Sequence, residues 1–198
     1  GLFQREWLRY MPTPPTCSRV VVSVDPAITT RNDETGIVVV GRHRDEAYVL
    51  DDLSGMLSPE QWAERAVAAA RRWKASSIVA ETNRGGDLVR TTIRQVDRGA
   101  NAVPIKEVRA NRGKDTRAEP IAALYEQGRV WHAQRFEKLE KQMLEWSPTS
   151  QEAQRAARQA TSPDRLDALV WGITELGFHL GVARGLAPLS VALPKNRI

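Results

Sequence analysis

The sequence has 198 residues, of which 41% are hydrophobic and 27% charged, enough for one folded domain with a substantial core. The net charge of +5 favours a polyanionic partner such as nucleic acid. The single cysteine, Cys17, excludes an intrachain disulfide framework and a zinc site built from several cysteines. No apolar run reaches the roughly 20 residues that span a bilayer.

The first 16 residues are predicted to form a linker. Residues 11–16 hold a proline-rich break that is typical of a connection between domains. The chain begins without methionine and without a signal-peptide layout, so we expect a fragment of a longer protein. Residues 17–180 are predicted to form the globular domain, and residues 181–198 a basic, loosely ordered tail.

Three strand patterns open the predicted domain, over residues 20–24, 36–40 and 47–53. Their short connections predict an antiparallel meander. The elements predicted after them, in chain order, are a helix from Ser58, a strand over 77–80, a helix over 87–96, a strand over 102–108, a helix over 116–126, a short strand over 130–132, a helix over 136–144 and a helix over 163–176. This order predicts an α/β domain with a mixed sheet flanked by helices, as in the RNase H-like fold.

Two of the predicted strands end on an acidic residue. Asp25 ends a run rich in valine, and Glu81 follows Ile-Val-Ala. Ligands of open α/β sheets gather at the carboxyl ends of the strands, where both acids lie. Two simpler interpretations stay open: Asp25 could begin an Asp-Pro-Ala turn, and Glu81 could pair with Arg84.

The last predicted helix carries two more acids. Its apolar residues recur at i, i+3, i+4 and i+7, which predicts a face packed on the core. At 100° per residue, Asp164, Asp167 and Trp171 fall together on an adjacent face. Asp164 could instead serve the helix dipole, because it lies in the first turn. Together with the two strand ends, these acids predict a site for Mg²⁺ or Mn²⁺, since such ions prefer oxygen ligands.

The predicted chemistry is phosphodiester hydrolysis with two metal ions. Two ions about 3.5–4 Å apart can activate a water and stabilise the leaving oxygen of a phosphodiester. Asp33 and Glu34 lie in the loop between the first two strands. We predict that both are solvated, with Asp33 the better candidate for an outer metal ligand.

Basic residues cluster around one loop of the predicted domain. They are candidates for sequence-independent contacts with DNA phosphates, unless the loop is simply solvated. The candidates are Lys114 and Arg117 first, then Lys106, Arg109 and Arg112, and Arg84 after the second strand-end acid.

Five segments, in family order across residues 20–176, resemble the C-terminal nuclease domain of the large terminase subunit of tailed bacteriophages. They are Val24-Asp-Pro-Ala27, Ala80-Glu-Thr-Asn-Arg-Gly-Gly86, Lys114-Asp-Thr-Arg-Ala-Glu-Pro120, Gly128-Arg-Val130 and Ser162-Pro-Asp-Arg-Leu-Asp-Ala-Leu-Val170. The resemblance implies an RNase H-like fold and a metal-dependent endonuclease that cuts concatemeric double-stranded viral DNA during genome packaging.

The resemblance also implies roles for single residues. Asp25, Glu81 and Asp167 match the catalytic acids that bind metal, and Asp164 matches a position that is acidic or histidine in relatives. The implied partners are double-stranded DNA, an ATPase domain of the same subunit, the small terminase subunit and the portal or procapsid, with no membrane. The implied setting is the host cytoplasm and not the mature virion.

One feature of the family's large subunit is missing from this sequence. Gly113-Lys114 is followed by Asp115, and Val108 stands where the first glycine of a phosphate-binding loop belongs, so ATP-driven translocation is not assigned to these residues. Two other functions stay open. One is a different RNase H-like nuclease, of the Holliday-junction resolvase or transposase type; the other is a nonenzymatic DNA-binding or docking module.

Overall fold

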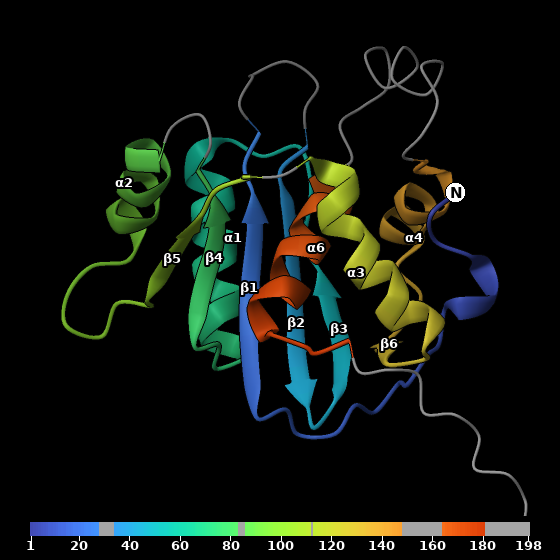
Figure 1. Ribbon diagram of the computed structural model, residues 1–198. Helices are drawn as coiled ribbons and strands as arrows, with labels where there is room; N and C mark the ends of the chain where they lie inside the picture. The colour runs from blue at the N-terminus through green and yellow to red at the C-terminus, as the bar shows by residue number, and fades with distance from the viewer. Residues whose placement is uncertain (28–33, 83–85, 112, 148–163, 181–198) are drawn as a thin grey trace, which may run out of the picture.

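A computed structural model describes residues 1–27, 34–82, 86–111, 113–147 and 164–180 of the chain. Within them, one mixed sheet has the strand order β5-β4-β1-β2-β3-β6 (Figure 1). The strands are β1 (Arg19–Asp25), β2 (Gly36–His43), β3 (Glu46–Asp52), β4 (Ser77–Glu81), β5 (Ile105–Val108) and β6 (Val130–His132). The helices are η1 (Arg5–Trp7), α1 (Pro59–Arg72), α2 (Gly86–Val96), α3 (Lys114–Glu126), α4 (Glu137–Glu145) and α6 (Asp164–Leu176).

The sheet confirms the predicted mixture of strand directions. β2 runs antiparallel to both β1 and β3, which is the predicted meander. β4 is parallel to β1, β5 is parallel to β4, and β6 is parallel to β3. The strand predicted over residues 102–108 is shorter than expected, and the helix predicted from residue 116 begins two residues earlier, at Lys114. The carboxyl ends of β1, β4 and β5 therefore share one edge of the sheet.

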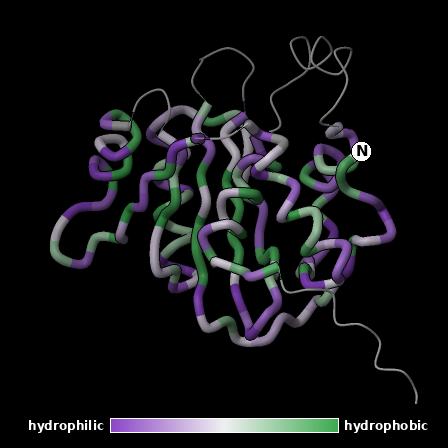
Figure 2. Tube along the Cα trace, in the orientation of Figure 1, coloured by the Kyte–Doolittle hydropathy of each residue, from purple (hydrophilic) through white to green (hydrophobic). Residues whose placement is uncertain are grey.

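Helices cover both faces of the sheet, α1 and α2 on one and α3, α4 and α6 on the other (Figure 1). The alternation of side chains along a strand divides the valines of β1 between the two cores. Val22 and Val24 pack with Trp62 of α1, whereas Val21 packs with Leu169 of α6. The hydrophobic colour is concentrated along the central strands in Figure 2. Within the described ranges, no helix has the length and apolar character needed to span a membrane.

Helix α6 approaches the sheet closely at two glycines. A Cβ atom on Gly36, the first residue of β2, would lie 2.0 Å from the carbonyl oxygen of Asp164. A Cβ atom on Gly172 would lie 2.8 Å from Cγ2 of Val40 and 3.1 Å from Cβ of Ser23. Any larger residue at Gly36 would push the start of α6 off the sheet, so this glycine sets the height of the α6 N-terminus above β2.

Local signals in the sequence set the ends of two other helices. Ser58, where the helix is predicted to start, accepts a hydrogen bond from the backbone N–H of Gln61 at 3.2 Å, and its own N–H donates to Gln61 Oε1 at 2.9 Å. This reciprocal capping box starts α1, with Pro59 in the first turn. Gly128, at φ +68°, ends the turn after α3 in the left-handed region that glycine adopts without strain.

The N-terminal segment packs on the domain along β6. Phe3 is buried edge-on against Tyr125, with ring centroids 5.5 Å apart. The backbone N–H of His132 donates to the Arg9 carbonyl at 2.8 Å, which places the segment beside β6. His132 is fully buried and bonds the Tyr125 hydroxyl at 2.8 Å and a carboxylate oxygen of Glu140 at 2.9 Å. This hydrogen-bonded cluster joins β6, α3 and α4 behind the N-terminal segment.

Candidate metal centre

Parallel pairing of β1 with β4 brings two of the predicted acids together. Val24 lies opposite Ala80 in the register, so the next residues, Asp25 and Glu81, end neighbouring strands at the same edge. Side chains alternate along a strand, and Val21 and Val79 face the core beneath α6. Asp25 and Glu81, four and two residues later, therefore face the side of the sheet that carries α6.

Helix α6 brings the other two acids to this edge. Asp164 and Asp167 lie in its first turn, and both are buried, each with 6% of its surface exposed. The sequence pattern predicted a helix with one buried face, but residues 164–173 are all buried, because α3 and α4 pack beside α6 over the sheet (Figure 1). The structure thus places all four predicted acids, from β1, β4 and α6, around the same end of the molecule.

Two further side chains contact these acids, and a third packs on one of the two. The Lys114 ammonium, at the start of α3, forms an ion pair with Asp167. The indole N–H of Trp171 donates to Glu81 Oε2 at 2.8 Å, as the predicted common face of Trp171 and Asp167 allows. The Arg117 guanidinium lies over the ring of Trp171, 4.6 Å from its centroid. These contacts orient two carboxylates and add positive charge beside them.

The acids perturb one another's ionisation. Burial, and then the charges of Asp167, Glu81 and Asp164, raise the pKa of Asp25 well above its usual range, while Lys114 acts in the opposite direction. Burial also raises the pKa of Asp167, although its ion pair with Lys114 opposes that shift. Mutually repelling carboxylates at one point are stabilised by a cation, and such perturbed acids are typical of functional sites.

The donor set suits Mg²⁺ or Mn²⁺, because every predicted ligand is a carboxylate oxygen. Across the described ranges, no three His, Cys, Asp or Glu side chains lie closely enough to hold a metal ion as they stand. Two of the acids are engaged otherwise, Asp167 by Lys114 and Glu81 by Trp171. The chemistry of the set therefore fits a divalent cation, and ion binding would require the acids to move closer together.

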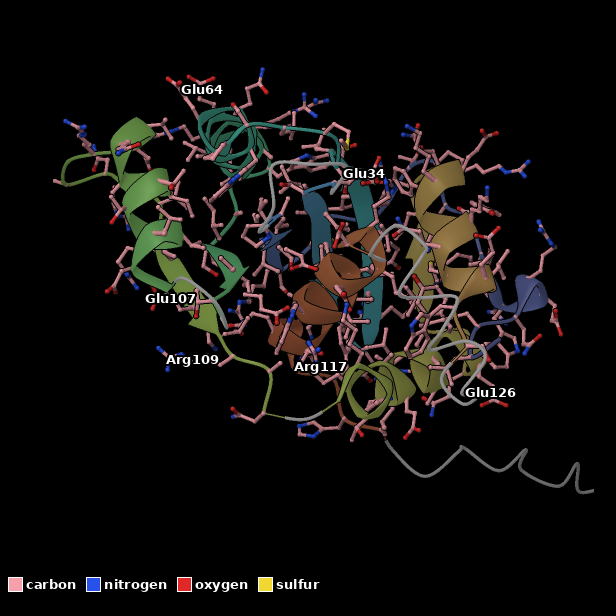
Figure 3. All side chains as sticks on the ribbon, turned by 90° about the horizontal axis from the view of Figure 1, so that it is seen from above. Glu34, Glu64, Glu107, Arg109, Arg117 and Glu126 are labelled. Carbon is pink, nitrogen blue, oxygen red and sulfur yellow. The ribbon has the colours of Figure 1, made fainter. Side chains whose placement is uncertain are left out.

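The predicted DNA-contacting residues separate into different settings. Lys114 and Arg117 face the acids and Trp171, whereas Arg109 is exposed after β5, away from α6 (Figure 3). Lys106 forms an ion pair with Glu175 at 2.8 Å. Arg84 and Arg112 lie outside the described residues, as does Asp33. DNA contact by these residues stays a prediction.

Sequence reasoning missed a second polar cluster beside the acids. The prediction that Glu34 is solvated is wrong, because both of its carboxylate oxygens accept hydrogen bonds from Arg165, at 2.8 and 3.0 Å. Arg165 also donates to Asp52 at the end of β3, at 2.7 Å. The signal that could have suggested this cluster is an arginine directly before Leu166, the first residue of the predicted core face.

Two comparisons with known proteins relate this arrangement to terminases. The family profile described as the terminase RNase H-like domain matches residues 22–176. A comparison with curated protein sequences finds no match. Among solved structures, the chain is similar to the nuclease domain of the large terminase subunit gp2 of bacterial virus Sf6, with a TM-score of 0.64, 14% identity, and coverage of 86% of this chain and 96% of that one.

Two other solved structures share the fold. The human cytomegalovirus terminase nuclease domain, described as soaked in Mn and bound to an inhibitor, gives a TM-score of 0.61 at 16% identity and covers 88% of this chain and 94% of that one. The large terminase of the thermophilic bacteriophage D6E gives a TM-score of 0.67 at 9% identity, over 90% of this chain. The match spans 45% of the length of the D6E protein.

The family match and the geometry agree. The family profile matches residues 22–176, from within β1 to the end of α6, and this range includes all four predicted acids. The strand order and the shared fold of the viral structures confirm the RNase H-like prediction. The chain belongs to the terminase RNase H-like domain family.

Proposed function

We propose that this chain is the nuclease domain of a large terminase subunit and hydrolyses phosphodiester bonds of concatemeric double-stranded viral DNA during packaging. The observation that carries the proposal is the convergence of Asp25, Glu81, Asp164 and Asp167 at one edge of the sheet, where the acids raise the pKa of Asp25. The manganese soak of the cytomegalovirus domain supports the use of a divalent metal.

Each side chain has a part in the proposed hydrolysis. Asp25, Glu81 and Asp167 would hold Mg²⁺ or Mn²⁺, with Asp164 as a further ligand. When bound, two such ions supply an activated water and offset negative charge on the leaving oxygen. The Trp171 N–H fixes the orientation of the Glu81 carboxylate through their 2.8 Å hydrogen bond.

The remaining roles follow from the family. We propose that the domain works beside an ATPase domain, as the 45% coverage of the D6E large terminase suggests, and with the small subunit and portal in the host cytoplasm. Lys114, Arg117 and Arg109, together with Arg84 and Arg112, are proposed to contact DNA phosphates. Exposed Arg109 would reach a duplex without breaking an ion pair of the metal centre.

Plasmid cleavage tests the proposal. We expect supercoiled plasmid to be nicked and linearised with Mn²⁺, and neither product to form with a chelator. Outer partners of a metal site are worth about 10–100-fold in activity, so removing a direct ligand in Asp25→Asn should cost more than about 100-fold. Asp45→Asn is the matched control, because the side chain of Asp45 is 79% exposed in the β2–β3 turn.

Three results would contradict the proposal. Failure of the folded wild-type protein to cut DNA with either ion would leave a nonenzymatic module. Full activity in Asp25→Asn would separate the cutting from these acids. A strong preference for four-way junctions over linear duplex would favour a resolvase.

A further inference from the structure

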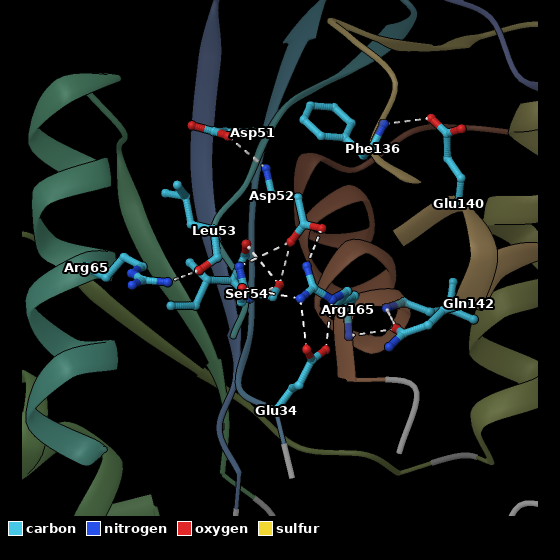
Figure 4. Close-up of polar contacts among 12 residues, drawn as sticks. Glu34, Asp51, Asp52, Leu53, Ser54, Arg65, Phe136, Glu140, Gln142 and Arg165 are labelled. Atoms are coloured by element: carbon cyan, nitrogen blue, oxygen red, sulfur yellow. Dashed lines mark hydrogen bonds and ion pairs between the residues drawn. The ribbon is translucent and has the colours of Figure 1, made fainter. Parts of the chain in front are cut away.

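Arg165 joins the first turn of α6 to two other elements (Figure 4). Its guanidinium donates to both carboxylate oxygens of Glu34, just before β2, and to Asp52, at the end of β3. It also donates to the carbonyl oxygen of Ser54 at 3.3 Å. The Arg165 and Asp52 side chains are each 5% exposed, and that of Glu34 is 19% exposed. The three charged side chains form a largely buried ion triad, in which Arg165 makes two hydrogen bonds to the two carboxylate oxygens of Glu34.

A second side chain fixes the same turn from α4. Gln142 Oε1 accepts hydrogen bonds from the backbone N–H groups of Arg165 and Leu166, at 3.1 and 3.2 Å (Figure 4). Those groups belong to the first turn of α6, where N–H groups have no partner within the helix. Gln142 is thus a cap supplied by another helix.

We propose that Arg165 is a positioning residue for the metal centre: it fixes the first turn of α6, which carries Asp164 and Asp167, against Glu34 and Asp52. Arg165 follows Asp164 directly and precedes Asp167 by two residues. The helical turn that Arg165 anchors is therefore the turn that carries both acids. The backbone contact of Gly36 with Asp164 limits the same turn from below. The start of β2 with the residues just before it, the end of β3, and α4 therefore all contact the first turn of α6, which carries the two acids.

The energetics favour positioning over stabilisation as the role of this triad. Removing three charges from water costs most of what their attraction returns, so a buried ion cluster is often no more stabilising than packed apolar residues. The two-pronged pairing of Arg165 with Glu34 does, however, fix direction and distance. Metal sites lose about 10–100-fold in affinity when the groups that orient their ligands are removed, and Arg165 would orient two ligands through the turn that it anchors.

The opposite end of α6 offers a matched control. Arg42 donates to the carbonyl oxygens of Leu176 and Gly177, at 2.8 and 3.0 Å, and so anchors the helix C-terminus. An arginine that only stabilises α6 would behave as Arg42 does. An arginine that positions the acids would alter metal binding as well.

Calorimetric Mn²⁺ titration of the folded, metal-free protein tests this inference, which rests on the proposed metal-dependent function. We expect Arg165→Met to weaken Mn²⁺ binding by about 10–100-fold. Arg165→Lys keeps the positive charge but cannot form the paired hydrogen bonds of a guanidinium, so its Mn²⁺ affinity should lie between those of Arg165→Met and the wild type. Arg42→Met should lower the melting temperature and leave Mn²⁺ affinity within about twofold of the wild type, since its contacts lie one helix length away.

The outcomes separate the inference from the proposed function. If Arg165→Met does not fold, Glu34→Gln removes the charge and one of the two acceptor oxygens that pair with Arg165, and it should weaken Mn²⁺ binding by at least about threefold, a part of the full loss. Wild-type affinity in a folded Arg165 or Glu34 variant overturns the inference and leaves the proposed function standing. Equal losses in Arg165→Met and Arg42→Met overturn it too, in favour of general helix stability. Absence of Mn²⁺ binding by the wild type overturns both proposals.

Discussion

Replacing Asp25 by asparagine should stabilise the metal-free protein and remove its response to metal. Burial and three neighbouring carboxylates raise the pKa of Asp25, so its ionised form destabilises the folded state at neutral pH. Asparagine keeps the shape of the side chain without the charge. Single stabilising replacements are worth about 0.5–2 kcal/mol, and for a domain of this size that is a rise of about 1–8 °C in melting temperature.

The sign of the pH dependence follows from the same shift. The folded protein holds the proton of Asp25 more tightly than the unfolded chain does, because its pKa is higher in the folded state. The free energy of unfolding of the wild type therefore falls as the pH rises from the ordinary pKa of an aspartate toward the raised pKa. The Asp25→Asn variant lacks this contribution, so its advantage should vanish in acid and grow toward neutral pH.

Metal should reverse the order of the two proteins. At a Mn²⁺ concentration of 100 times Kd, binding to the folded state alone adds about 2.7 kcal/mol, or about 5–11 °C. The assay is thermal unfolding followed by circular dichroism, at several pH values, with a chelator or with Mn²⁺. We expect the shift in the wild type and none in Asp25→Asn.

Asp51→Asn is the matched control for this experiment. Asp51 lies near the carboxyl end of β3, and burial raises its pKa as well. Its carboxylate accepts a hydrogen bond from the N–H of Asp52, which an asparagine carbonyl can also accept. This variant should keep the full Mn²⁺ shift. A metal-free Asp25→Asn protein that melts below the wild type, or that retains the Mn²⁺ shift, would refute the reasoning.

Three other predictions concern contacts around the site. Trp171→Phe keeps an aromatic ring but loses the N–H donated to Glu81, so the rate of plasmid cleavage should fall by about 10-fold. This loss is equivalent to about 1.4 kcal/mol, near the value of a hydrogen bond to a charged group, and unchanged cleavage would contradict this role. Phe3→Ala should lower the free energy of unfolding, measured by urea titration, by about 3 kcal/mol, because it leaves a buried cavity beside Tyr125. A loss below about 1 kcal/mol would mean that the N-terminal segment packs loosely. The pKa of Glu140 is lowered, because its hydrogen bonds outweigh the opposing effect of burial. Glu140→Gln should therefore lower the free energy of unfolding at neutral pH but not in acid, and a loss that stays constant from about pH 3 to 7 would exclude this explanation.

Much of the fold was predictable because local signals agreed with one another. Valine runs marked the strands, and Ser58 followed by Pro59 marked the start of α1. The order of a meander followed by alternating helices and strands predicted a mixed sheet with Asp25 and Glu81 at the carboxyl ends of its strands, and the parallel pairing of β1 with β4 places the two acids side by side. The all-round burial of α6 was not predictable from its own pattern, because it depends on how α3 and α4 pack beside it.

The second polar cluster could not be predicted because its partners are far apart in the chain. Arg165 and Glu34 are separated by 131 positions, and Gln142 caps a helix that begins 22 residues after it. Periodicity describes which face of one element is buried, and it carries no information on which polar groups meet across elements. A charged residue within a buried stretch indicates that a partner exists, without indicating where the partner lies.

Lys114 also shows that sequence alone does not identify the partner of a charged residue. Its place in a basic loop predicted a phosphate contact, and in the structure its ammonium group pairs with Asp167. Sequence cannot separate these two roles, because a phosphate and a buried carboxylate are both anions and both attract a lysine. The pairing has a physical consequence for the site. An ion that binds Asp167 competes with the Lys114 ammonium for the same carboxylate, so metal binding would release a positive charge beside the place where the proposed function puts a DNA phosphate.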